Sequence, residues 1–184
     1  MIKSLCLTFA FLCAVPVAVL AQTPAAPPAN PISASEAHMY TMLSGMIVTA
    51  AEKMPEENYS FKPSPDVRTF GQLVGHLSDA QYFFCSSVAS EKNPTQNAEK
   101  TKTTKADLIT ALKDANTYCG KVYGDMTDAK GGEMMKLMNY DMAKLAVLAA
   151  NFAHDYEHYG NMATYMRIKG IVPPSSEKHD APKK

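Results

Sequence analysis

The chain has 184 residues, of which 46% are hydrophobic, and its formal net charge at pH 7 is zero. This length is enough for one domain with its own core and is short for two. Because the lysines and arginines are scattered and balanced by acidic residues, the sequence lacks the basic surface that nucleic acids require, and a nucleic-acid partner is not expected.

The first 21 residues have the pattern of a cleaved export signal. Lys3 precedes an apolar run over residues 5–20, and residues 19–21 (Val-Leu-Ala) resemble a signal peptidase site. Pro16 interrupts the run, and no later segment approaches the roughly 20 apolar residues that a membrane span requires. We expect a signal peptide over residues 1–21, no stable membrane insertion, and an exported protein that is periplasmic or extracellular.

Residues 22–33 are rich in alanine and proline and predict a flexible spacer. The expected folded domain spans residues 34–174, and a polar, loose tail follows over residues 175–184. A first helix is predicted from Ser33, which forms a capping box pattern with Glu36, to about residue 54.

Three further helices are predicted after a proline-containing loop over residues 56–66, which Tyr59 and Phe61 are expected to pin to the core. Thr69 and Thr104 are suitable N-caps for helices that reach about residues 90 and 126. The inward face of the first of these is expected to carry Leu73, Leu77, Ala80, Phe83 and Phe84.

The last predicted helix runs from Asp141 to Lys169, where Gly170 and the following prolines end it. The methionine-rich segment 133–139 before it predicts a short helical turn. No segment alternates with the two-residue period of a half-buried strand. The sequence therefore predicts an all-α four-helix bundle, an architecture whose interior often holds metals on facing helices.

His154 and His158 are four residues apart in the last predicted helix, so both imidazoles lie on one face and can reach one point. A catalytic metal usually has a third protein ligand and one open position. His76, on the inward face of the second predicted helix, is the candidate for that third ligand. A lone histidine on an apolar face is more often a core residue, whereas a histidine pair favours a metal.

Residues 154–158 (His-Asp-Tyr-Glu-His) also fit the H-x-x-E-H pattern of the inverted zinc peptidases, in which the glutamate is a general base. Little chain follows His158 to supply the downstream glutamate ligand of those enzymes. Glu157 is therefore a candidate base, a residue that orients a ligand imidazole, or a solvated carboxylate.

Three stretches resemble the DinB-like family of small metal-binding four-helix bundles. They are residues 69–76 (TFGQLVGH), residues 154–161 (HDYEHYGN) and residues 165–174 (YMRIKGIVPP). The resemblance implies that His76, His154 and His158 bind one divalent metal. Asn161 stands where the family usually has glutamine. Three imidazoles suit zinc, nickel, copper or iron and do not choose among them.

Some relatives in that family are thiol-dependent transferases or isomerases. The resemblance therefore implies a metal-dependent enzyme of the transferase or hydrolase type that acts on a small molecule, with an open coordination position for thiol or water. The alternative is a non-catalytic module that uses metal to staple its helices or to sense metal. A homodimer is compatible with the sequence.

Cys85 and Cys119 remain after the expected signal is removed. Cys85 lies 16 residues beyond Thr69 and Cys119 lies 15 beyond Thr104, so each sits about 23 Å along its helix. These heights agree only if the two helices are parallel, as in the up-down-down-up order of DinB-like proteins, with a long connection between helices 2 and 3. We therefore predict a structural disulfide between the two cysteines.

Overall fold

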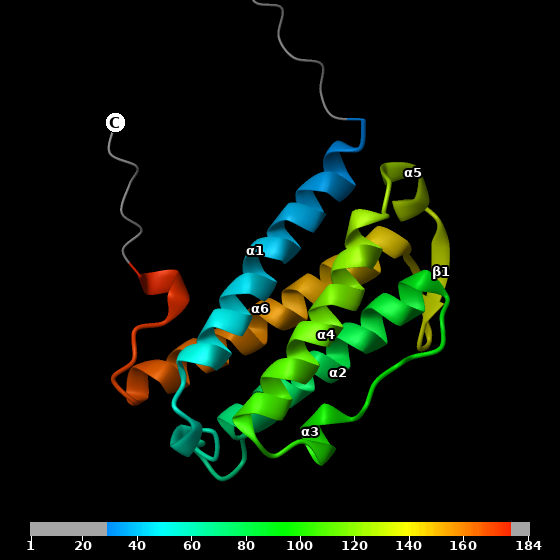
Figure 1. Cartoon of the computed structure of the whole chain (residues 1–184). Helices are drawn as coiled ribbons and strands as arrows, with labels where there is room; N and C mark the ends of the chain where they lie inside the picture. Colours follow the sequence, from blue (N-terminus) through cyan, green and yellow to red (C-terminus); the bar gives the residue numbers. More distant parts are fainter. Residues whose placement is uncertain (1–28, 178–184) are drawn as a thin grey trace, which may run out of the picture.

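The computed structural model describes residues 29–177, so the expected signal peptide, residues 22–28 of the spacer and residues 178–184 of the tail lie outside the described residues. Four long helices form a bundle (Figure 1): α1 (Pro31–Lys53), α2 (Phe70–Ala89), α4 (Lys105–Gly124) and α6 (Lys144–Ile168). The short elements are η1 (Glu56–Asn58), α3 (Ala98–Thr101), α5 (Asp128–Gly131), β1 (Met134–Leu137), β2 (Tyr140–Ala143) and η2 (Pro174–Ser176).

Two of the helices begin at the N-caps that the sequence predicts. The side chain of Thr69 accepts from the backbone N–H of Gln72 at 3.1 Å, and the Gln72 side chain accepts from the backbone of Thr69 at 2.9 Å. This reciprocal pair satisfies two N–H groups at the start of α2. Thr104 accepts from the backbone N–H of Asp107 in the same way at the start of α4.

The start of α1 differs from the prediction, because the helix begins at Pro31 and Ser33 is not its N-cap. Ser33 is buried, and its backbone N–H and hydroxyl both donate to Asp128 Oδ1 at 2.8 Å, while the backbone N–H of Ile32 donates to Oδ2. A carboxylate from the distant helix α5 thus caps the first turn of α1. The last three residues of the expected spacer are therefore helical.

The prediction of a helical turn over residues 133–139 is wrong. This segment forms most of an antiparallel hairpin in which Met134 pairs with Ala143 and Leu137 pairs with Tyr140. Because β2 occupies residues 140–143, α6 begins at Lys144 and not at Asp141. The fold is mostly helical with a small hairpin, which corrects the all-α expectation.

The first residues of the expected loose tail pack on the bundle. Ser175 belongs to η2, and its backbone N–H donates to the hydroxyl of Tyr159 at 2.8 Å. Glu177 forms an ion pair with Lys53 at the end of α1. The ordered domain therefore extends a few residues beyond Pro174.

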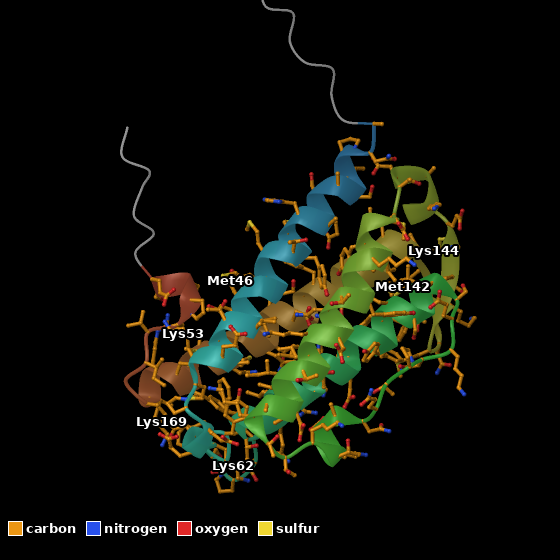
Figure 2. The ribbon with its side chains drawn as sticks, in the orientation of Figure 1. Met46, Lys53, Lys62, Met142, Lys144 and Lys169 are labelled. Atoms are coloured by element: carbon orange, nitrogen blue, oxygen red, sulfur yellow. A yellow bond between two sulfur atoms is a disulfide. The ribbon has the colours of Figure 1, made fainter. Side chains whose placement is uncertain are left out.

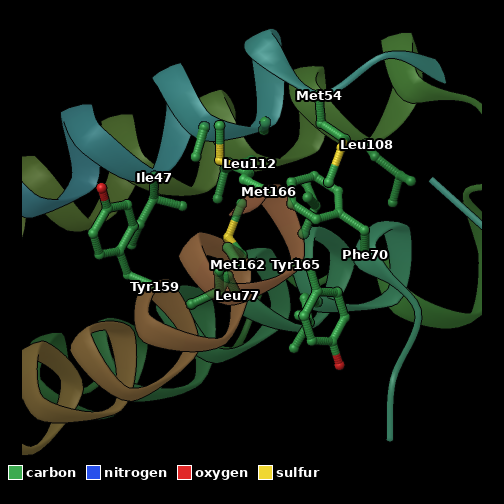
Figure 3. Close-up of a cluster of buried hydrophobic side chains, with 14 of the residues drawn as sticks. Ile47, Met54, Phe70, Leu77, Leu108, Leu112, Tyr159, Met162, Tyr165 and Met166 are labelled. Carbon is green, nitrogen blue, oxygen red and sulfur yellow. The ribbon is translucent and has the colours of Figure 1, made fainter. Parts of the chain in front are cut away.

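The core lies between the four long helices and forms two clusters. Figure 3 shows the larger cluster, in which side chains such as Ile47, Leu77, Leu112 and Met166 meet from all four helices. Each of these side chains is fully buried, and such burial stabilises the fold by about 1.5–3 kcal/mol per side chain. The smaller cluster surrounds the stacked rings of Tyr40 and Tyr123.

Cys85 and Cys119 form a disulfide inside the smaller cluster, with their Cα atoms 5.3 Å apart. A second contact joins the same two helices, because the Ser78 hydroxyl donates to the carbonyl of Ala111 at 3.0 Å. The two contacts join α2 to α4 at two places along each helix.

The two ends of the bundle carry different connections. Figure 2 shows Lys62, in the loop between α1 and α2, near one end, with Met142 and Lys144 of the hairpin region near the other. Over residues 29–177, no helix combines the length and apolarity needed to cross a membrane.

Candidate metal centre

His76, His154 and His158 come together between α2 and α6. The Nε2 atom of His154 lies 3.1 Å from Nε2 of His76 and 3.2 Å from Nε2 of His158. One potential ligand atom from each residue lies within 4.8 Å of the other two. His154 and His158 follow one another by one turn on α6, and α2 supplies His76 from the facing helix.

The spacing of these nitrogens fits a shared divalent metal. Imidazole nitrogens that bind one zinc ion at 2.0–2.1 Å in tetrahedral geometry lie roughly 3.3 Å from one another. The two measured separations in the cluster are close to this value. Three ring nitrogens that point at each other also need a common partner, because at most one of each pair can donate a hydrogen bond to the other.

The local environment favours neutral imidazoles at His76 and His158. Burial, followed by the nearby charges of His154, His76 and Arg68, lowers the pKa of His158 to about 4. Burial and the positive charge of Arg68 also lower the pKa of His76, although Glu99 acts in the opposite direction. A neutral imidazole is the form that binds metals, so both shifts favour metal binding at neutral pH.

The Nδ1 atoms on the far sides of the rings have different surroundings. His76 Nδ1 lies 3.1 Å from Glu99 Oε2, and His158 Nδ1 lies 3.4 Å from the side-chain amide of Asn161. His154 Nδ1 is buried without a hydrogen-bond partner in the described part of the chain. Its neighbour Asp155 Oδ1 is likewise unpartnered and lies 3.8 Å away.

Glu99 reaches His76 because α3 is held tightly against α2. Asp79 on α2 accepts from the backbone N–H groups of Ala98 and Glu99 at 2.8 and 3.0 Å. Gly75 makes the close approach possible, since a Cβ atom there would lie 2.6 Å from the backbone of Glu99. The second carboxylate oxygen of Glu99 accepts from Arg68 Nε at 2.9 Å. Arg68, Glu99 and His76 therefore form a continuous chain of contacts.

Asp155 belongs to a buried polar group behind the histidines. Its side chain is fully buried, and Oδ2 accepts from Gln81 Nε2 at 2.7 Å. Burial raises the pKa of Asp155, and the contacts with His154 and Gln81 oppose this effect. Gln81 Oε1 accepts from Tyr40 and from Asn151, so the group links the three helices α1, α2 and α6.

Two cavities open beside the histidines. His158 lines a cavity of about 580 Å³ together with Arg68, Glu157, Asn161 and Tyr165. His76 and His154 line a shallower cavity of about 350 Å³ together with Phe83 and Phe84. The cluster is therefore accessible to small molecules.

The structure brings together the three histidines singled out in the sequence. Glu157 is exposed and lines the larger cavity, with no hydrogen bond to the three rings among residues 29–177. His38 is exposed on α1, as expected, and His179 lies outside the described residues. The prediction that Phe83 faces inward is wrong, because its side chain is 37% exposed.

Sequence reasoning missed Glu99, Arg68 and Asp155. Glu99 lies in a polar connection that has no periodic pattern, so no sequence signal marked it. Asp155 is adjacent to His154 on a predicted buried helix, and a carboxylate there is a signal of a buried polar contact. Arg68 directly precedes the N-cap of α2, close to the helix that carries His76.

Comparisons with known proteins agree with this architecture. The chain is 25% identical to the uncharacterized protein YjoA of Bacillus subtilis over 123 residues, which cover 65% of this chain and 79% of that protein. A crystal structure of a DinB-like protein from Bacillus cereus matches with a TM-score of 0.68 and 17% identity, over 77% of this chain and 95% of that one.

The crystal structure of YjoA itself matches with a TM-score of 0.64 and 18% identity, over 79% of this chain and 99% of that one. These structural likenesses concern the fold. Residues 39–162, which include all three histidines, match the family model of the DinB superfamily. The chain therefore belongs to the DinB superfamily.

Proposed function

We propose that this protein binds one divalent metal ion through His76, His154 and His158, and that it is a metal-dependent enzyme of the transferase or hydrolase type acting on a small molecule. The observation that carries the proposal is the convergence of three imidazole Nε2 atoms, two pairs of which are 3.1 and 3.2 Å apart. Zinc, nickel, copper and iron all suit this set of ligands.

The residues around the histidines support binding and orientation of a small molecule. A metal with three imidazole ligands supplies Lewis acidity and lowers the pKa of a thiol or water that binds to it. Glu99 fixes the ring of His76, and the cavity beside His158 provides polar side chains on one side of the site. Those side chains can hold a substrate in a defined orientation.

A non-catalytic module that is stapled by metal or senses metal is the second candidate. The placement of the histidines favours it, because a metal held by His76 of α2 and His154 of α6 would link the two helices. A closed site with four protein ligands is typical of structural metals, whereas a site with three favours catalysis. X-ray absorption spectroscopy of the metal-loaded protein counts the protein ligands and distinguishes the two.

Elemental analysis of untagged protein after reconstitution with each metal tests the proposal directly. We expect about one metal per chain in the wild type and a large loss in His154→Ala, which removes one of three ligands. His38→Ala is the matched control, because this histidine is exposed on α1. Metal-free wild type, or the same metal content in His154→Ala, contradicts the proposal.

We also propose that the protein is exported after removal of residues 1–21. The sequence pattern of those residues supports the proposal, and a disulfide such as Cys85–Cys119 is typical of proteins outside the reducing cytoplasm. Cell fractionation followed by intact-mass measurement tests it. A chain that keeps its first 21 residues and stays in the cytoplasm contradicts it.

Finally, we infer an up-down-down-up order for the four long helices. The contacts Ser78–Ala111 and Cys85–Cys119 support parallel α2 and α4. The contacts of His76 with His154 and of Arg68 with Tyr165 support α6 running antiparallel to α2. From one contact to the other, the residue number increases along α2 and decreases along α6.

A further inference from the structure

The two cavities at the histidines differ in chemistry. The cavity beside His158 is lined mainly by charged and polar side chains, whereas the groove beside His76 and His154 is lined mainly by Phe83, Phe84 and an alanine. Each histidine lines only one of the two, so the cluster lies at their boundary. A molecule bound where the three Nε2 atoms converge can therefore extend one part into each cavity.

The groove offers an aromatic surface without a free charge. The Phe83 side chain is 37% exposed, its ring lies 5.1 Å from that of Phe84, and the Phe84 ring lies 5.8 Å from that of His154. Asp79 is the one carboxylate that lines the groove, and both of its oxygens accept hydrogen bonds from the segment 95–99. An apolar group, preferably aromatic, is the complement to such a surface.

The polar cavity contains a guanidinium group close to the histidines. Arg68 donates through Nε to Glu99, which contacts His76, and its side chain is 41% exposed. Its terminal nitrogens have no hydrogen-bond partner among residues 29–177, so the outer edge of the guanidinium can accept a carboxylate in the bidentate manner.

Apart from Arg68 and Glu99, the charged side chains of the polar cavity have no hydrogen bond to the histidines among residues 29–177. Lys62 donates to the carbonyl of Pro65, and Asp66 and Glu157 are exposed with no ion pair in the described part of the chain. None of these three side chains has a hydrogen bond to Glu99 or to a histidine there. Arg68 is therefore the charged group best placed to bind a substrate held at the histidines.

We propose that the substrate is an amphipathic small molecule, with an apolar group that packs on Phe83 and Phe84, a carboxylate that binds Arg68, and a metal-binding group between them. This inference rests on the proposed metal centre and names the substrate class of that same site.

Hydroxamates of defined structure test the inference, because a hydroxamate chelates divalent metals and can carry different groups. The probes are acetohydroxamate as the reference, phenylacetohydroxamate, succinate monohydroxamate and the hydroxamate of β-alanine, which replaces the carboxylate by an amine. Each is titrated into cobalt(II)-loaded protein, and its dissociation constant is read from the visible absorption of the metal. Cobalt content is measured first for every variant.

In the wild type we expect the phenyl probe to bind about tenfold more tightly than acetohydroxamate, as burial of part of a ring implies. The carboxylate probe should gain about fivefold from a charged hydrogen bond to an exposed arginine. Phe83→Ala should remove only the phenyl gain, and Arg68→Gln should remove only the carboxylate gain. Both side chains are substantially exposed, so both variants should fold.

Matched controls use residues that line neither cavity. Tyr156→Ala removes an aromatic ring that is 58% exposed on α6, and Arg167→Gln removes an arginine that hydrogen-bonds to Ser176. Neither should change any affinity. The inference is overturned if the wild type shows no gain, if the gains survive in the Phe83 and Arg68 variants, or if the amine probe binds more tightly than the carboxylate probe. Absence of cobalt binding overturns the metal centre itself.

Discussion

At the scale of single residues, His154 has a buried ring nitrogen with no hydrogen-bond partner in the described part of the chain. Its Nδ1 and the Oδ1 of Asp155 are both buried, both unpartnered and 3.8 Å apart, which is too far for a hydrogen bond. When a metal binds Nε2, the proton of a neutral imidazole is on Nδ1, where it needs an acceptor. Asp155 is the neighbouring carboxylate that can provide one.

We predict that Asp155→Asn weakens metal binding by at least tenfold. The one amide oxygen of asparagine must accept from Gln81, so the amide nitrogen, which cannot accept, faces His154. Loss of an acceptor behind a ligand imidazole typically costs 10–100-fold in affinity. Competition with a chromophoric chelator measures the dissociation constant. Asp141→Asn, an exposed position on the hairpin, should bind metal like the wild type. Equal affinity for Asp155→Asn and wild type would show that this carboxylate does not position His154.

The sequence predicts the histidines better than their supports. The spacing of His154 and His158 is enough, because four residues on a helix place two side chains on one face. His76 could be paired with them through its helix face and the family resemblance. Glu99 could not be predicted, since its position depends on Asp79 and Gly75 holding a four-residue helix against α2.

At the scale of elements, local sequence signals predicted where helices begin, whereas elements that depend on distant contacts were not predicted. Thr69 and Thr104 are local capping signals, and both were correct. The hairpin has no such signal, because the first residue of its turn is Met138, at a φ of 53°, where a glycine is usual. The cap of α1 comes from Asp128, more than 90 residues away, so a local pattern at Ser33 misplaced it.

The backbone of α3 lies against Gly75 of α2 so closely that a larger residue does not fit there. A methyl group there would lie 2.6 Å from the backbone of Glu99, so Gly75→Ala must displace α3 and move Glu99 away from His76. We expect a net loss of about 1–2 kcal/mol in the free energy of unfolding, since overpacking exceeds the gain in helix propensity.

Thermal or urea unfolding of Gly75→Ala measures this loss. Gly45→Ala on α1 is the matched control, because no atom lies within 4 Å of the added methyl group. That variant should be as stable as the wild type or up to about 1 kcal/mol more stable. If both alanine variants gain stability alike, α3 is not packed against Gly75 in solution.

The cap of α1 by Asp128 should make stability depend on pH. Hydrogen bonds from the backbone and side chain of Ser33 and from the backbone of Ile32 lower the pKa of Asp128 in the folded protein. A group with a lowered pKa stabilises the fold above its unfolded pKa, and this contribution is lost as the pH falls below about 4.

We therefore expect Asp128→Asn to melt at a lower temperature than the wild type at pH 7, and the difference to shrink at pH 3. Scanning calorimetry at several pH values measures both melting temperatures. Asp141→Asn, whose carboxylate is exposed beside Lys136, should show little difference at either pH. A difference for Asp128→Asn that does not change between pH 7 and pH 3 contradicts an ionic cap.

At the scale of the whole molecule, a long connection joins α2 to α4. The segment between α2 and α4 contains α3 (Figure 1), which brings Glu99 into contact with His76. The disulfide between Cys85 and Cys119 closes this segment into a loop with a sequence separation of 34 residues. One covalent bond therefore limits the freedom of the segment that supports the site.

We predict that loss of this disulfide lowers stability by about 3–4 kcal/mol, the loop-closure value for a loop of that length. For a domain of this size, the melting temperature should then fall by roughly 10 °C. The measurement compares oxidised wild type with the Cys85→Ala, Cys119→Ala double variant in thermal unfolding. Protein reduced under denaturing conditions, alkylated and refolded is unsuitable, because both cysteines are fully buried and would have to accommodate bulky adducts.

The single variant Cys85→Ala separates the effect of the bond from that of packing. It breaks the same bond while leaving Cys119 as a free buried thiol beside Asn151. If stability falls because the unfolded chain gains conformational entropy, the loss should be nearly as large in the single variant as in the double. Because the closed loop includes α3, metal affinity should also fall in both variants when it is measured near the melting temperature, and it should match the wild type at low temperature. If both variants have the same melting temperature as the wild type, the bond does not restrain the segment between α2 and α4, and α3 is held by Asp79 and Gly75 alone.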